Sequence, residues 1–183
     1  MDYRATLRAD CQHCQALCCV SLPFDRGEEF GFDKPANAAC LHLAPGHGCR
    51  IHGELEARGQ AGCAAYDCYG AGQRITRELF PGVSWQLEPE ARASLFEAFR
   101  RLKRVHELRL LLHEASRLSL SGARASERML LLTRLEPAQG FSRESLAALE
   151  LPALEADVHA WLRGLSRELS PERARRSLPL LGR

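Results

Sequence analysis

Cys11-Gln12-His13-Cys14-Gln15-Ala16-Leu17-Cys18-Cys19 is the stretch that decides how this chain is organised. It places four thiols within nine residues. The other four cysteines follow at positions 40, 49, 63 and 68, and the chain has none after Cys68. A lone cysteine is usually a small buried side chain, whereas thiols clustered this densely are typical of a metal or iron–sulfur site. The sequence therefore predicts a thiol-rich N-terminal module and a thiol-free C-terminal one.

The rest of the composition indicates the compartment and the class of partner. No segment approaches the roughly 20 continuous apolar residues that span a bilayer, and the first eight residues lack the apolar run of a signal peptide. We therefore expect a cytoplasmic protein with no membrane partner. Stable disulfides are rare in that reducing compartment, which leaves the thiols free for metal. The formal net charge of +2 gives no clear nucleic-acid signal.

Glycine, proline and apolar spacing divide the chain into four parts. Residues 1–72 have frequent glycine and proline and weak apolar periodicity, so we expect short turns and brief helices held by metal ligation. Residues 73–88, which include Pro81-Gly82, are predicted to be a connector. Residues 89–170 should form a helical bundle, and residues 171–183 a basic tail. The predicted fold is mostly α, with a small irregular cysteine-rich metal-binding module packed on a three- to four-helix bundle.

The helical half shows apolar residues at intervals of three and four. This spacing predicts a long amphipathic helix over about 89–119, beginning near Pro89 and ending at Ser121-Gly122. A second helix is predicted over about 124–135, a short one from an N-cap at Ser142 to about 150, and a last one from Pro152. No segment alternates with the period of a β-strand.

The spacing of the first four cysteines limits how they can meet. On one helix, Cys11, Cys14 and Cys18 would share a face, while Cys19 would be turned by about 100° from Cys18. Cys19 would then join the same centre only if the helix breaks, or it would serve a neighbouring centre. The thiols that follow come from separate loops and can complete the coordination. The candidate metal ligands are Cys11, Cys14, Cys18, Cys19, Cys40, Cys49, Cys63 and Cys68.

Eight thiols are compatible with several inorganic groups. They can form two four-thiolate sites, one four-iron cluster plus a zinc ion, or one cluster with spare thiols. Spacing alone does not decide between zinc and an iron–sulfur cluster, because thiolate is a good ligand for both. Histidines stand close to several cysteines, and His52, three residues after Cys49, is the most suitably spaced of these as a further ligand.

These motifs resemble a known family. The Cys11–Cys19 cluster, Cys40-Leu41-His42-Leu43, Cys49-Arg50-Ile51-His52 and Gly62-Cys63 are similar to the zinc- or iron-chelating cysteine-cluster family, the YkgJ type with a CxxCxxCC motif. In that family two residues separate the CC pair from the cysteine before it. Here three residues, Gln15-Ala16-Leu17, separate Cys14 from the pair. The resemblance implies metal binding and does not imply a particular reaction.

A more extended resemblance is to the N-terminal region of actinobacterial pentapeptide-repeat proteins. It is carried by Leu17-Cys18-Cys19-Val20, Phe32-Asp33-Lys34-Pro35-Ala36 and Tyr66-Asp67-Cys68-Tyr69-Gly70-Ala71-Gly72-Gln73, although this chain has no pentapeptide repeats.

Three functions follow from this sequence. The leading hypothesis is a metal-binding protein that holds zinc or an iron–sulfur cluster through its cysteine thiolates. The second is an iron–sulfur redox protein or enzyme component, for which no catalytic residue can be assigned. The third is an interaction module in which zinc fastens the loops and the helices bind a protein partner.

Overall fold

The structure, a computed structural model, describes residues 3–168, so the basic tail predicted at 171–183 lies outside the described residues. Within that range the fold is mostly helical and contains no β-strand, only two isolated antiparallel bridges, as predicted. The chain divides into two compact units, which we describe separately. One runs from Arg4 to Lys103, and the other comprises Arg104 onward with the N-terminal end. Helix α5, Arg92–Ala115, passes from one unit into the other.

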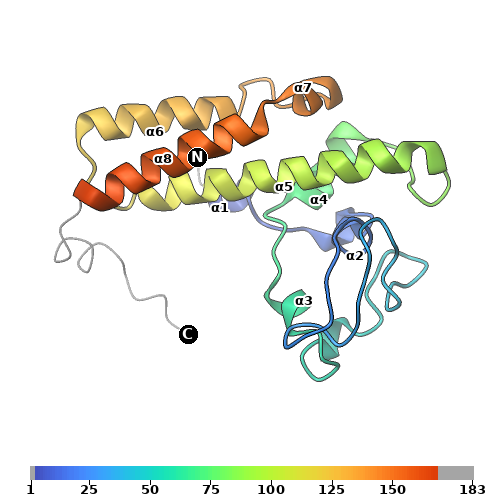
Figure 1. The fold of residues 1–183 in the computed structure, drawn as a ribbon. Coiled ribbons are helices and arrows are strands. Elements are labelled where there is room, and N and C mark those ends of the chain that lie inside the picture. Colours follow the sequence, from blue (N-terminus) through green and yellow to red (C-terminus); the bar gives the residue numbers. More distant parts are fainter. Residues whose placement is uncertain (1–2, 169–183) are drawn as a thin grey trace. The chain divides into compact units, whose positions relative to one another are not determined.

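The C-terminal unit is built from the end of α5, α6 (Gly122–Leu135), α7 (Arg143–Ala148) and α8 (Leu151–Glu168). Helices α6 and α8 lie side by side (Figure 1). Ion pairs join the helices: Arg104 of α5 pairs with Glu155 of α8, and Arg134 of α6 pairs with Asp157 of α8. The buried apolar residues of this unit, which form its core, are Val105, Leu108, Leu112, Leu131, Leu132, Leu135, Leu146, Leu151, Leu154, Val158, Trp161 and Leu165.

The predicted helices of this half are confirmed, with shifts of a few residues at their ends. The long helix begins with a 3₁₀ turn at η4, Pro89–Ala91, continues as α5 and stops at Ala115, before the predicted end. Ser121 caps α6 by accepting a hydrogen bond from the Arg124 N–H. Ser142 caps α7 in a reciprocal capping box.

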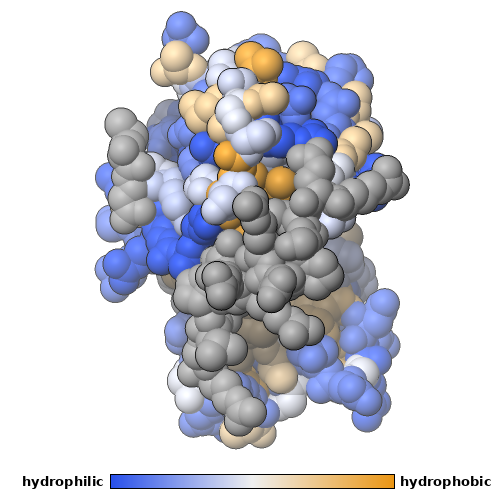
Figure 2. Space-filling model, turned by 90° about the vertical axis from the view of Figure 1, so that its left-hand side faces the viewer, coloured by the Kyte–Doolittle hydropathy of each residue, from blue (hydrophilic) through white to orange (hydrophobic). Residues whose placement is uncertain are grey.

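Hydrophilic and hydrophobic residues both appear on the face of the molecule drawn in Figure 2. On the face drawn in Figure 2, hydrophilic residues predominate and apolar residues gather in small groups. None of the helices described in residues 3–168 combines the length and the apolar character that a membrane span requires.

The N-terminal unit is built from short elements. They are α1 (Tyr3–Thr6, which begins before the unit boundary), η1 (Cys11–His13), α2 (Leu17–Ser21), η2 (His52–Glu54), α3 (Ala61–Ala65), α4 (Ala71–Arg74) and η3 (Ile75–Leu79). η3 is a π-helical turn that directly continues α4. The first part of α5 completes the unit. Its apolar core draws on two stretches, with Leu7, Leu17 and Val20 from the first, and Ala71, Ile75, Leu79, Phe80, Trp85, Leu95, Phe96, Phe99 and Leu102 from the second.

The segment between these two stretches has almost no core. From residue 22 to residue 60, the buried side chains are the polar Lys34 and Gln60, and no hydrophobic side chain in this fully described segment is buried. Figure 1 shows the segment as long irregular loops between α2 and α3. An isolated bridge between Phe24 and Lys34 and another between Leu43 and Cys49 are its sheet-like contacts. Hydrophobic burial therefore does little to hold this segment in place.

Residues 11–19 do not form one continuous helix. η1 ends at His13, and Cys14 is extended, with φ −122° and ψ 143°. Ala16 then adopts the left-handed conformation at φ 55° before α2 starts at Leu17. An L-residue rarely takes this conformation, so the break is a specific local feature. Because of this break, the thiols before and after Ala16 do not have the relative directions that one continuous helix would impose.

Candidate metal centre

One group of thiols surrounds α4. A Cβ atom placed on Gly72 of that helix would lie 2.6 Å from the Cys14 Sγ and 3.8 Å from the Cys68 Sγ, so both sulfurs border the same point. Cys11 is linked to Cys14 by a one-turn hydrogen bond, from the Cys14 N–H to the Cys11 carbonyl. η1, which begins at Cys11, itself packs on α4. Thus residues far apart in the sequence bring these three thiols to one helix.

Electrostatics agrees with this grouping. Burial raises the pKa of the Cys14 thiol to about 11, with the charges of Cys68 and Cys11 as smaller contributions to that value. Burial also raises the pKa of Cys11, with Cys68 and then Cys19 as the next contributors. Removal from water is thus the main cause for both thiols, and the like charges of neighbouring thiols add to it.

The loop that carries Cys14 is fastened by Gln15. Its N–H donates to the Thr76 hydroxyl over 3.3 Å, and its side-chain amide donates to the Val83 carbonyl over 2.6 Å. The Trp85 indole N–H in turn donates to the Gln15 carbonyl over 2.9 Å. These bonds connect the break between η1 and α2 to the chain after α4. The connector predicted at 73–88 is therefore part of what positions the thiols.

Cys18 and Cys19 lie together on α2, with their sulfurs 3.9 Å apart. Their hydrogen bond, together with burial, raises the pKa of Cys18. The same bond lowers the pKa of Cys19, and the charge of Lys34 lowers it further. The pair therefore tends to share one proton, with the thiolate on Cys19. Cys18 also responds to the charges of Cys14 and Cys68, which places it beside the group around α4.

A second group of thiols lies on the loops after α2. The Cys40 N–H donates to the Cys19 carbonyl over 2.9 Å, so the loop at 40 runs directly against α2. Cys49 faces Leu43 in an isolated bridge, and the Leu43 N–H donates to the Cys40 carbonyl. Burial raises the pKa of Cys63 to about 11, and the charges of Cys19, Cys40 and Cys49 are smaller contributions to that value.

A buried ammonium group stands beside this second group. The Lys34 side chain has 3% of its surface exposed, and its Nζ donates to the carbonyls of Val20, at 3.1 Å, of Leu22, and of Pro35, at 3.2 Å. Burial lowers its pKa, while the charges of Cys40, Cys19 and other thiols raise it. Lys34 therefore ties the end of α2 to the loops and presents a positive charge to the thiols.

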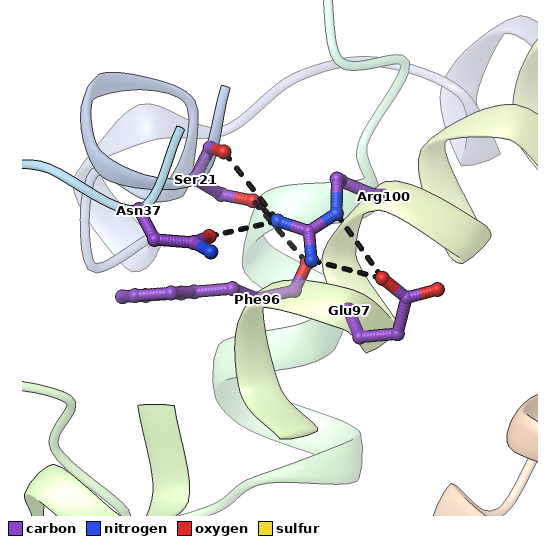
Figure 3. A network of polar contacts seen from close by, with 5 residues as sticks. All are labelled: Ser21, Asn37, Phe96, Glu97 and Arg100. Atoms are coloured by element: carbon purple, nitrogen blue, oxygen red, sulfur yellow. Dashed lines mark hydrogen bonds and ion pairs between the residues drawn. The ribbon is translucent and has the colours of Figure 1, made fainter. Parts of the chain in front are cut away.

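Arg100 of α5 anchors the other side of α2, as Figure 3 shows. Its Nη1 donates to the Ser21 hydroxyl over 3.0 Å and to the Asn37 Oδ1 over 2.8 Å, and its guanidinium pairs with Glu97. The buried Ser21 hydroxyl donates to the Phe96 carbonyl over 3.2 Å. Because Ser21 lies two residues after Cys19, this network fixes the helix turn that carries the two adjacent thiols.

The eight cysteines form no disulfide in the structure, so all are free to act as thiolates. Among residues 3–168, no three cysteine, histidine or carboxylate side chains lie close enough, in the positions shown, to hold one metal ion. The donor set nevertheless fits a soft metal, because all eight candidate ligands are cysteines without a disulfide, and thiolate is a preferred ligand of zinc and of iron–sulfur clusters.

The structure also places residues that the sequence analysis did not assign to the site. Lys34 and Gly72 belong to motifs that were recognised, but only the fold shows the ammonium beside the thiols and the glycine against the Cys14 sulfur. The signals were a lysine in the Phe-Asp-Lys-Pro motif and a glycine four residues after Cys68. His52 lies on η2 and no interaction places its ring at a thiol, so its predicted role stays a prediction.

Fold and site together define a mostly helical protein with a cysteine-rich unit of loops and short helices. The chain is similar to the uncharacterized protein YybG of Bacillus subtilis (strain 168), with 36% identity over 156 residues. That match covers 85% of this chain and 56% of YybG, so the chain spans about half the length of this relative. No family model matches the chain. No solved structure matches it either.

Proposed function

We propose that this protein binds metal, holding zinc or an iron–sulfur cluster through the thiolates of its clustered cysteines. The observation that carries the proposal is the segment from residue 22 to residue 60, in which no hydrophobic side chain is buried. Its conformation includes left-handed residues at Asn37 and His47, which add conformational cost. Cys40 and Cys49 lie within this segment, and the Cys40 N–H donates to the carbonyl of Cys19, which lies outside it.

The energies favour this explanation. Ordering a chain costs conformational entropy, which hydrophobic burial offsets in an ordinary domain. This segment buries no hydrophobic side chain, so another interaction has to stabilise its fold. Metal ligation by thiolates contributes directly to folding free energy and is the usual source of stability in such modules.

Chemistry and the resemblance of the motifs support the same proposal. The bound group would supply Lewis-acid attraction for the thiolates and, if it is an iron–sulfur cluster, a one-electron redox centre. The cysteine spacing is similar to that of the zinc- or iron-chelating cysteine-cluster family, and a cytoplasmic location would keep the thiols reduced. YybG, as an uncharacterized protein, adds no activity to this argument.

Anaerobic purification of the full chain, with elemental analysis and a visible spectrum, tests the proposal. We expect either stoichiometric zinc in a colourless protein or iron and sulfide in a brown one. The brown outcome would favour the redox function, because iron–sulfur clusters are electron carriers. A reduced, folded protein that contains neither metal, and takes up neither on reconstitution, would overturn the proposal.

A chelator experiment measures the structural consequence. Removing the metal should expose the loops between α2 and α3 to proteolysis and leave α6 and α8 protected, because those helices have their own apolar core. Equal protease sensitivity of the loops with and without metal would contradict this expectation.

A further inference from the structure

Two observations show that the thiols fall into two neighbourhoods. Cys14 and Cys68 border a single point on Gly72 of α4, and η1, where Cys11 lies, packs on the same helix. Cys40 is instead hydrogen-bonded through its backbone to Cys19, and the turn that begins at Cys40 leads back to the bridge at Cys49. The first neighbourhood is built on the helices and the second on the loops.

The dipeptide Cys18-Cys19 stands at the boundary between them. Consecutive residues on a helix point in directions about 100° apart, so neighbouring thiols of α2 can face different partners. The Cys40 N–H donates to the Cys19 carbonyl over 2.9 Å, so Cys19 lies on the side of the loops. The Gly62 N–H, next to Cys63, donates to the Glu29 carbonyl over 3.0 Å, which joins Cys63 to the same loops. Cys18 is then the thiol of α2 that remains for the group around α4.

We infer that the eight cysteines form two separate four-thiolate metal centres. One consists of Cys11, Cys14, Cys18 and Cys68, and the other of Cys19, Cys40, Cys49 and Cys63. This inference rests on the proposed function and adds to it the number of centres and the ligands of each.

The two centres would differ in their surroundings. The first is closely bordered by the backbone of α4, because Gly72 leaves no side chain between that helix and the Cys14 sulfur. The second has the Lys34 ammonium at its edge, held by three backbone carbonyls. Four thiolates around a divalent ion carry a net charge of −2, so this ammonium partly neutralises the second centre. Metal should therefore bind the two centres with different affinities.

The competing arrangement puts Cys18 and Cys19 on the same ion. Tetrahedral zinc with bonds of about 2.3 Å holds its sulfurs about 3.8 Å apart, and these two sulfurs are 3.9 Å apart. That distance alone permits both arrangements. They differ in stoichiometry and in which thiols become protected together, and both of these can be measured.

Zinc titration of the reduced full chain is the first test. Aliquots are alkylated with N-ethylmaleimide at each zinc concentration, and mass spectrometry of the peptides reports which cysteines are protected. We expect about two zinc ions per chain and two sets of four thiols whose protection rises together. Saturation at one zinc ion, or sets that mix the assigned members, would overturn the inference while leaving metal binding intact. A chain that takes up no zinc would instead refute the proposed function.

Paired variants resolve the case in which both centres fill together. Cys14→Ser with Cys68→Ser removes two ligands of one centre, and the chain should keep about one zinc ion. Cys14→Ser with Cys63→Ser removes one ligand of each, and zinc content should fall severalfold below that of the first pair. Equal zinc content in the two pairs would contradict the assignment. Far-UV circular dichroism shows that each variant keeps its helices, and the first pair matches the second in the number of thiols removed.

Discussion

Replacing Lys34 by methionine tests whether a buried ammonium holds the loops of the N-terminal unit. The change keeps an unbranched side chain, one atom shorter, and removes three donated hydrogen bonds, to the carbonyls of Val20, Leu22 and Pro35. A buried acceptor left without its partner costs about 1–3 kcal/mol. The Val20 carbonyl is bonded in a buried contact and should bear the full cost, whereas the other two are partly buried and water can replace part of the loss.

Methionine also recovers the free energy that burying an ammonium consumes, which offsets some of this loss. We therefore expect Lys34→Met to lower the free energy of unfolding by about 2–4 kcal/mol, a large part of the 5–15 kcal/mol of a typical domain. Urea unfolding of the reduced, metal-loaded chain, followed by circular dichroism, measures this as a fall in midpoint with an unchanged slope.

The chain offers a matched control in Lys103, its only other lysine. The Lys103 Nζ lies 5.4 Å from the centre of the Tyr66 ring on a partly exposed face of α5, where a cation–π contact contributes about 0.5–1 kcal/mol. Lys103→Met should therefore cost clearly less than Lys34→Met. Equal midpoints for the two variants would refute the reasoning about the buried ammonium.

Three further changes test other parts of the structure. Gly72→Ala should lower zinc affinity at least tenfold, because the new Cβ would lie 2.6 Å from the Cys14 sulfur and displace it. Competition with a chelator measures this, and an unchanged affinity would contradict it. Burial lowers the pKa of His113, so below pH 6.5 the unfolded chain binds more protons than the folded one. The free energy of unfolding should therefore fall as the pH drops through that value. His113→Phe should flatten this pH dependence in urea melts, and an unchanged pH dependence would count against the reasoning. Glu136→Ala removes a partner of Arg109, whose side chain is 2% exposed. The free energy of unfolding should fall by about 1–2 kcal/mol, a moderate loss because Glu136 itself is half exposed. A thermal melt that matches the unsubstituted chain would contradict this.

The helical half could be predicted from the sequence because its information is local. Apolar residues at intervals of three and four define the buried faces of α5, α6 and α8, and Ser121 and Ser142 mark two helix starts. The end of α5 was placed too late, since helix ends depend on competition with the following turn. The cysteine spacing likewise predicts the ligands of the candidate site, and that assignment stays a prediction.

The sequence by itself determined which chemistry this protein has available: eight thiols in one region, and helices without thiols in the other. Only the tertiary structure decided which thiols face each other, because that depends on the left-handed turn at Ala16, on the packing of Cys14 against Gly72 and on the contact of Cys40 with Cys19. These contacts join residues that are far apart in the chain, and no local pattern encodes the distance between them. The charge of Lys34 could be read from the sequence, but its place beside the thiols follows from the three carbonyls that hold it.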